Sequence, residues 1–458
     1  MRRILPVFLL LAASTAFAQE EVRLEVPYER FVLPNGLNVI LHEDHTTPMV
    51  SVNVYYHVGS GREKPGRTGF AHLFEHIMFE GSGHVPEGAF DNWLEAAGAS
   101  NNGSTNTDRT NYYEDLPSNA LELALFLESD RMGYLLDAMS PEKVDGQRDV
   151  VKNERRQSYE NRPYGLASEI MAENLYPADH PYHWTTIGSM DDLSAASYED
   201  VVEFFSTWYV PANASLSIAG DIDIEETKAM VEKWFSDVPA GAPVPPADAG
   251  VAFLSEEKRL VHEDRVSLPR LYMTWLSPAY YAPGDAEADV LGDVLAGGKT
   301  SRLYQRLVYE LQIAQNVFAF QSSRMLGSQF MIVATARAGH DLDELEVVIQ
   351  EEIDRIKMEA PSQREVARVV NQIEASRLDG LERIGGFGGK ADRLNAYYMY
   401  TGNPDYFNED LARYQALDPS DIQAVAQTWL RDDGRVILSV VPEGQTELAS
   451  EGVKPKTD

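Results

Sequence analysis

The sequence of 458 residues contains no cysteine. It can therefore form no disulfide bond, and any metal site must use histidine or carboxylate ligands. Long hydrophobic runs are missing as well, because no stretch after the N-terminal segment approaches the ~18 uninterrupted apolar residues of a membrane-spanning helix. We therefore expect a soluble mature protein without a membrane span.

Basic residues are scarce, with 39 Lys and Arg against 72 Asp and Glu, so the net charge is -33 at pH 7. A strongly negative surface repels the phosphates of nucleic acids and the headgroups of anionic lipids. Neither is an expected partner. The acidity is compatible with basic peptides as substrates, and equally with a role in keeping an exported protein soluble.

The chain begins with a segment typical of a secretory signal peptide, residues 1–18, which read MRRILPVFLLLAASTAFA. Two arginines precede a short apolar run, and an Ala-x-Ala cleavage signature follows it. We expect export in a bacterium, most simply to the periplasm. The remaining 440 residues, 458 minus 18, are enough for roughly two to four domains.

Residues 66–83 are predicted to form a helix. Thr68 is a candidate N-cap and Gly81 a candidate C-terminal stop. Between them the apolar residues recur at helical spacing, namely Phe70, Leu73, Phe74, Ile77 and Met78.

This predicted helix carries the motif His-x-x-Glu-His. His72 and His76 stand one turn apart, so both imidazoles can reach one metal ion, and the ligand type suits Zn²⁺. Glu75 lies beside them, where it can take a proton from a water molecule at the metal. The order is the inverse of the zincin motif. Taken alone, the pattern fits a metal site and a chance arrangement in an unrelated helix equally well.

A second helix is predicted for residues 141–160, beginning at Pro141, and Glu154 on it follows His76 by 78 residues. Its inner side is expected to carry Val144, Val150 and Val151. Here the sequence resembles the pitrilysin and insulysin family of metallopeptidases, in particular bacterial members similar to processing peptidases. In that family the inverted motif is followed by a zinc-binding Glu in the pattern Arg-x-Val-Val-x-x-Glu, which begins here at Arg148.

The resemblance covers nearly the whole chain after residue 18. It implies that Zn²⁺ is held by His72, His76 and Glu154 and that Glu75 is the catalytic base. The opposing interpretation is that Glu154 is one charge on a solvated helix face. Gln147 stands seven residues before Glu154, where many relatives carry another Glu. Its amide can bond a ligand or water but cannot titrate, so we expect it to support the ligands more weakly than that Glu.

Residues 100–117 are polar and rich in Asn and Thr, which favours a strand with one side open to solvent. The segment resembles the family's substrate-binding edge strand at Asn102, Thr105, Asp108, Thr110 and Tyr112. Gly103 replaces the usual Ala. We expect an extended peptide to bind near Asn102 and Thr105 by pairing with the sheet edge. The alternative is an ordinary polar edge strand.

An internal repeat links residues 199–221 with residues 420–442. The matched residues are Asp200, Thr207 and Trp208 with Asp421, Thr428 and Trp429, at a constant offset of 221. The sequence thus predicts two homologous α+β halves, residues 24–240 and 251–447, each a mostly antiparallel sheet with helices packed on one face. A Pro-rich linker, residues 241–250, joins them, and a loose polar tail, residues 448–458, follows. The resemblance implies that the halves enclose a chamber.

The second half lacks the inverted motif, and it also lacks an Arg and a Tyr that the family uses to contact substrate. Val308 and Gln315 occupy those positions, whereas Arg306 and Tyr309 are out of register and are expected to be structural. Such donors are typically worth about 3 kcal/mol each at the transition state. In some relatives a partner subunit supplies the pair. We therefore expect a heterodimer with a sister subunit of the same fold.

The sequence as a whole predicts an exported zinc-dependent endopeptidase that hydrolyses peptides or unfolded segments. The alternative is a non-catalytic peptide-binding or scaffold subunit, because the fold also occurs in inactive relatives. Further histidines, His42, His45 and His57, have no partner at ligand spacing and are expected at the surface or rim. The Gly-rich residues 384–390 are expected to form a hinge or a substrate-contacting loop.

Overall fold

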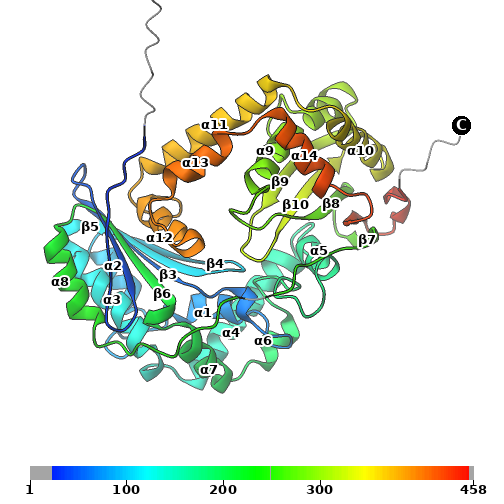
Figure 1. The fold of residues 1–458 in the computed structure, drawn as a ribbon. Helices are drawn as coiled ribbons and strands as arrows, with labels where there is room; N and C mark the ends of the chain where they lie inside the picture. The colour runs from blue at the N-terminus through cyan, green and yellow to red at the C-terminus, as the bar shows by residue number, and fades with distance from the viewer. Residues whose placement is uncertain (1–22, 248, 453–458) are drawn as a thin grey trace, which may run out of the picture.

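The computed structural model describes residues 23–247 and 249–452 (Figure 1). The predicted signal peptide, residues 1–18, lies outside these ranges. Within them, no helix combines the length and the apolar character that crossing a membrane requires.

The first half is built on a six-stranded sheet. In spatial order its strands are β1 (Glu29–Val32), β2 (Asn38–Glu43), β6 (Ala214–Gly220), β3 (Met49–Tyr56), β5 (Thr110–Pro117) and β4 (Ser100–Thr105). β2 and β6 run parallel, and the other neighbouring pairs are antiparallel. A tight turn at Asn35 and Gly36 joins β1 to β2, and Gly36 in it has a φ of 91°.

The second half is built on a five-stranded sheet. Its strands are, in order, β7 (Lys258–Asp264), β11 (Arg435–Pro442), β8 (Arg270–Ser277), β10 (Ser328–Ala336) and β9 (Ala314–Ser322). One pair, β11 with β7, is parallel, and the others are antiparallel. The order matches that of the first sheet without β1, which confirms the prediction of two homologous halves.

The helices occupy most of the remaining chain (Figure 1). Those of the first half are α1 (Phe70–Ile77), α2 (Ala89–Ala96), α3 (Leu121–Tyr134), α4 (Pro141–Arg155), α5 (Ala167–Leu175), α6 (Met190–Ala195), α7 (Tyr198–Trp208) and α8 (Ile224–Phe235). Those of the second half are α9 (Asp285–Ala296), α10 (Leu342–Met358), α11 (Gln363–Leu381), α12 (Lys390–Thr401), α13 (Phe407–Gln415) and α14 (Pro419–Trp429). Each half has its own large apolar core between its sheet and its helices.

The residues of the internal repeat have matching structural roles in the two halves. Asp200 and Asp421 each occupy position N3, the third residue of α7 and of α14, and each completes a capping box with the N-cap residue. Thr207 and Thr428 each donate a side-chain hydrogen bond to the carbonyl four residues earlier, at 2.7 and 2.8 Å. Each helix then leads into a central strand, β6 or β11. The repeat is therefore a capped helix followed by a buried strand.

The opposite face of each sheet also carries a helix, and that helix comes from the other half. α5 packs its residues Ala167 and Met171 against Leu438 and Val440 of β11. α12 lies over β3, where the Asn395 amide donates to the Asn53 carbonyl at 2.8 Å (Figure 1). Within each half the helices pack on one face of the sheet, as predicted, and the opposite face is covered by a helix of the other half. This exchange fixes the two halves against each other.

Two sequence expectations about local structure were wrong. Residues 100–117 form two strands instead of one, because the Asn106 side chain accepts from the backbone N–H groups of Asp108 and Arg109 at 2.7 and 2.9 Å and so closes a turn. The tail is not loose up to residue 452: the Ser450 N–H donates to the Ser439 hydroxyl at 3.0 Å. Residues 453–458 lie outside the described ranges.

Candidate metal centre

The helix α1 places the motif on the face that its core packing leaves free. Leu73, Phe74 and Ile77 are fully buried in the core of the first half. His72 and His76 are partly buried, and their rings meet edge to face with centroids 4.9 Å apart. The apolar spacing therefore determines which way the imidazoles point.

The start of α1 is capped differently from the prediction. Gly69 is the N-cap, with a φ of 87°, whereas the Thr68 hydroxyl donates to Asp192 at 2.6 Å. The cap is supplied by Glu63, whose carboxylate accepts from the N–H groups of Gly69 and Ala71 at 3.0 and 2.8 Å. Burial raises the pKa of Glu63 to about 8. Local spacing could not reveal this, because the capping side chain lies outside the helix.

The end of α1 also differs from the prediction. The helix ends at Ile77, four residues before Gly81, which has a φ of 88° in the following turn. A Cβ on Gly81 would lie 2.7 Å from the Val85 carbonyl oxygen. Gly81 is therefore required by that turn and does not stop the helix.

The helix α4 begins and runs as predicted. Ser140 caps it by accepting from the Lys143 N–H at 3.4 Å, and Pro141 is its first residue. Val144 and Val151 are buried, but Val150 is 45% exposed, so its expected inward position was wrong. A short π-helix, Arg156–Glu160, follows.

Arg155 ties the end of α4 to the start of α1. Its guanidinium donates to the Gly188 carbonyl at 2.6 Å and forms an ion pair with Glu169 at 2.9 Å. Gly188 in turn lies so close to Gly69 that a Cβ on it would be 2.3 Å from the Gly69 nitrogen. The two helices that carry the candidate ligands are therefore held together through one loop.

The three predicted ligands meet at one point. The Nε2 atoms of His72 and His76 lie 3.6 and 3.3 Å from the same carboxylate oxygen of Glu154, and the three ligand atoms lie within 4.8 Å of one another. Two atoms bound at about 2.05 Å and the tetrahedral angle to one zinc ion are about 3.3 Å apart. The buried Nδ1 of His72 has no partner among the described residues. The donor set and its spacing fit Zn²⁺.

Glu75 lies between this cluster and the sheet edge. A Cβ built on Gly103 of β4 would be 3.2 Å from the Cγ of Glu75. β4 pairs with β5 alone and is the edge strand, as predicted. Asn102 is exposed on β4 and accepts from the Gly103 N–H at 2.8 Å, and the Thr105 hydroxyl donates to Thr110 at 3.4 Å. Glu75, the predicted base, therefore sits beside the sheet edge at which the sequence predicted peptide binding.

Gln147 lies on α4, but its amide does not bond a candidate ligand. It donates to Glu80 at 2.5 Å. Burial and the charge of Glu87 raise the pKa of Glu80. Sequence reasoning overlooked Glu80, which follows the end of α1 but lies within residues 66–83, four residues after His76.

The other histidines are not ligands of a second cluster. His72, His76 and Glu154 form the one potential metal-binding group found in residues 23–247 and 249–452. His42 is buried and bonds to the Pro27 carbonyl at 2.7 Å, so its expected surface position was wrong. His45 is exposed between Glu43 and Asp221, as expected.

The positions of the missing Arg and Tyr lie in the second half. Val308 is 7% exposed in the apolar core, within the π-helix Tyr304–Glu310, and Gln315 is exposed on β9. Arg306 forms ion pairs with Glu351 and Glu352 at 2.9 and 3.0 Å. It therefore has a structural role, as expected.

A duplicated α+β fold with two histidines and a glutamate clustered in its first half defines a class of zinc peptidases. A model of the family described as insulinase, peptidase family M16, matches residues 38–179. A model described as the peptidase M16 inactive domain matches residues 195–373, consistent with the second half lacking the motif. The chain belongs to peptidase family M16.

Relatives span most of the chain. Zinc protease PqqE of Helicobacter pylori is 26% identical over 426 residues, covering 91% of this chain and 93% of that protein. A protein of Arabidopsis thaliana named as a probable mitochondrial-processing peptidase subunit beta is 24% identical and covers 90% of this chain and 77% of its own length. The crystal structure of a protease from Helicobacter pylori has a TM-score of 0.85 at 26% identity and covers 91% of this chain and 99% of its own.

Proposed function

We propose that the protein is an exported, zinc-dependent endopeptidase that hydrolyses peptides or unfolded polypeptide segments. The observation that carries this proposal is the convergence of His72, His76 and Glu154 on one point, with Glu75 beside it next to the edge strand β4. The name zinc protease among its relatives supports the same chemistry.

The side chains divide the work of peptide hydrolysis. Zinc held by His72, His76 and Glu154 would polarise the scissile carbonyl and lower the pKa of a water molecule. Glu75 accepts the proton from the attacking water and passes it to the leaving amine. The edge of β4 holds the substrate extended by backbone hydrogen bonds near Asn102 and Thr105, which makes binding tolerant of sequence.

The enclosed interior predicted for the fold would exclude folded proteins and admit extended chains. The net charge of -33 favours basic substrates over acidic ones by long-range attraction. Residues 1–18 have the pattern of a signal peptide, so we place the activity in the periplasm.

A sister subunit is part of the proposal. Val308 is enclosed in the core and Arg306 is committed to Glu351 and Glu352, so neither supplies a donor to substrate. A relative that is named as a subunit beta shows that a chain of this kind can be one part of a larger peptidase. We therefore propose a heterodimer in which a homologous partner contributes an Arg and a Tyr.

The test combines metal analysis with peptidase assays on a quenched basic peptide. The purified chain is assayed alone and mixed with a homologous subunit that carries the Arg and Tyr, with Glu75→Gln as the control. Zinc near one ion per chain and activity in the mixture, lost by at least about 100-fold in Glu75→Gln, would support the proposal. Absence of zinc, or activity indifferent to Glu75, would instead support a peptide-binding or scaffold subunit.

A further inference from the structure

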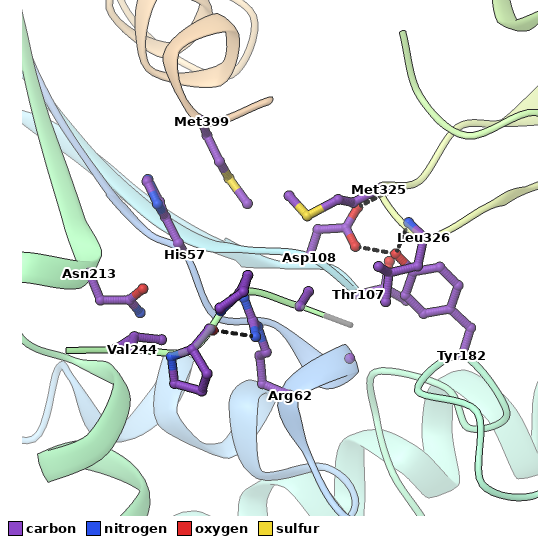
Figure 2. Close-up of a pocket in the computed structure, with 14 residues that line it drawn as sticks. His57, Arg62, Thr107, Asp108, Tyr182, Asn213, Val244, Met325, Leu326 and Met399 are labelled. Atoms are coloured by element: carbon purple, nitrogen blue, oxygen red, sulfur yellow. Dashed lines mark hydrogen bonds between the residues drawn. The ribbon is translucent and has the colours of Figure 1, made fainter. Parts of the chain in front are cut away.

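A cavity of about 300 Å³ lies where the two halves meet the linker, and the metal ligands do not line it (Figure 2). The first half contributes the residues before α1 and the turn between β4 and β5. The linker contributes residues 244–247, and the second half contributes Met325, Leu326 and Met399. A molecule bound there would contact all three parts of the chain.

The cavity contains a cation without a matching anion. Arg62 is partly buried, donates one hydrogen bond to the Pro245 carbonyl at 3.0 Å and lies over the ring of Trp208 at 5.1 Å. Within residues 23–247 and 249–452, no carboxylate forms an ion pair with it, and burial lowers the pKa of its guanidinium. Most of the five N–H donors of this group remain available for an anion.

The acidic side chain that lines the cavity, Asp108, is committed to other partners. One carboxylate oxygen accepts from the Tyr182 hydroxyl at 2.5 Å and the other from the Met325 N–H at 3.0 Å (Figure 2). Burial raises the pKa of Asp108, with these hydrogen bonds opposing the effect. Asp108 thus joins the two halves beside the cavity; its charge acts on Arg62 from a distance, but it makes no direct ion pair with the guanidinium.

The remaining side chains that line the cavity are neutral or apolar and would contact the uncharged part of a ligand. Burial, together with the charge of Arg62, lowers the pKa of His57 to about 4, so the imidazole is neutral at neutral pH and adds a polar contact without a second charge. Met325 and Met399 extend into the cavity from opposite elements of the second half (Figure 2). Methionine side chains adapt to apolar groups of varied shape.

We propose that this cavity binds a small carboxylate with an apolar body, of the size of one or two amino-acid residues, and that the carboxylate pairs with Arg62. A volume of about 300 Å³ is at the lower end for ligand sites, which sets the ligand size. Such a group occurs in a free acylated amino acid and at the C-terminus of a short peptide. Because the ligand contacts both halves and the linker, its binding stabilises their closed arrangement. The site goes beyond the proposed peptidase and does not depend on it.

The test is isothermal titration calorimetry on the full chain with N-acetyl-L-leucine and its uncharged match, N-acetyl-L-leucinamide. A second arm compares an eight-residue peptide ending in a free leucine carboxylate with the same peptide amidated, which distinguishes the two sources of the carboxylate. The variants are Arg62→Met and Met399→Trp, the latter filling the cavity without removing a charge. Arg431→Met, whose guanidinium lies over Phe253, is the matched control.

We expect the acid to bind saturably and the amide to bind at least about tenfold more weakly, as for loss of a charged hydrogen bond. Arg62→Met should lower the affinity for the acid about tenfold, and Met399→Trp should abolish its binding. Arg431→Met should bind the acid as tightly as the wild type does. Equal binding of acid and amide, no saturable binding, or full binding by both cavity variants would overturn the proposal. Binding at the metal would persist in both variants, so failure here is distinct from failure of the peptidase proposal. If circular dichroism shows that Arg62→Met is misfolded, the proposal is judged on Met399→Trp alone: loss of acid binding in that variant supports it, and full binding overturns it.

Discussion

Glu75 of α1 and Gly103 of the edge strand β4 face each other so closely that little room is left for a larger side chain at Gly103. A methyl group on Gly103 would lie 3.2 Å from the Cγ of Glu75 and 3.1 Å from the ring of Tyr112. Contacts of that length require a small shift, which the flexible Glu75 side chain can make. We predict that Gly103→Ala keeps kcat/KM within about threefold and that Gly103→Val lowers it by about 100-fold, because misplacing a base by about 1 Å is costly.

Measuring the zinc content of the Gly103 variants shows whether a loss of activity comes from a displaced Glu75 or from a lost metal site. Both Gly103 variants should retain zinc, since Gly103 faces Glu75, whereas the three predicted ligands lie on α1 and α4. Gly146→Ala, at an exposed position of α4 where an added Cβ would meet nothing within 4 Å, is the control for a glycine substitution as such. Full activity of Gly103→Val would show that Glu75 is not held by this contact.

Two side chains on α4 provide a matched pair for the metal site. Glu154 lies 3.3 Å from the Nε2 of His76, whereas Gln147 donates to Glu80. We predict that Glu154→Ala loses zinc and that Gln147→Ala retains it, with activity reduced by about tenfold at most. Metal analysis by mass spectrometry of both purified variants is the measurement. Equal zinc in the two variants would remove Glu154 from the ligand set.

The part of the site that sequence reasoning predicted depends on short-range spacing. His72 and His76 are one helical turn apart, so spacing alone paired them, whereas Glu154 was assigned because residues 148–154 resemble the family's pattern on a helix that Pro141 predicted. The repeat predicted the duplicated fold because a capped helix leading into a buried strand leaves the same spacing in both copies.

The parts that were missed depend on contacts between distant segments. Glu63 caps α1 from outside the helix, and α5 and α12 cross to the opposite sheet through contacts such as Asn395 with Asn53. Ser450 was assigned to a loose tail because its docking on Ser439 and Asp343 leaves no local pattern. The periodic spacing of apolar residues shows which face of a helix or strand is buried. It does not show which other segment of the chain covers that face.

Arg131 on α3 is a buried charge that packs against Tyr112 of β5. It is 1% exposed, donates to Glu128 at 2.9 Å and to Glu114 at 3.3 Å, and lies 4.1 Å from the ring centroid of Tyr112. We predict that Arg131→Met lowers the free energy of unfolding by about 3–5 kcal/mol, because it leaves the acidic pair Glu114 and Glu128 buried without a cation, where burial and the charge of Glu128 already raise the pKa of Glu114. Denaturant unfolding of the purified chain measures the change.

A combined variant tests that explanation. Adding Glu114→Gln and Glu128→Gln to Arg131→Met removes the unpaired charges and should recover part of the lost stability. No recovery would mean that Arg131 acts through its packing on Tyr112 and not through its charge.

The pH dependence of stability should include a contribution from Asp289 on α9. Burial and the charge of Asp285 raise the pKa of Asp289 to about 7, although it accepts from the Tyr414 hydroxyl at 2.7 Å. The pKa of an aspartate in the unfolded chain is about 3.9. Between these values the folded state binds the proton more tightly than the unfolded state does. This contribution to the free energy of unfolding is therefore present at low pH and is lost as the pH rises toward about 7.

The variant Asp289→Asn isolates this contribution, because its amide oxygen can still accept from Tyr414 and it does not titrate. We predict that the free energy of unfolding falls less steeply between pH 5 and pH 8 in the variant, by roughly 1 kcal/mol or more, and that the variant is the more stable protein at pH 8. Glu287→Gln, two residues earlier on the same helix, controls for loss of an acidic side chain. Denaturant unfolding at each pH gives the slopes. If the slopes of Asp289→Asn and the wild type coincide, Asp289 is ionised in the folded protein throughout this range, and the Tyr414 hydrogen bond and nearby arginines outweigh its burial.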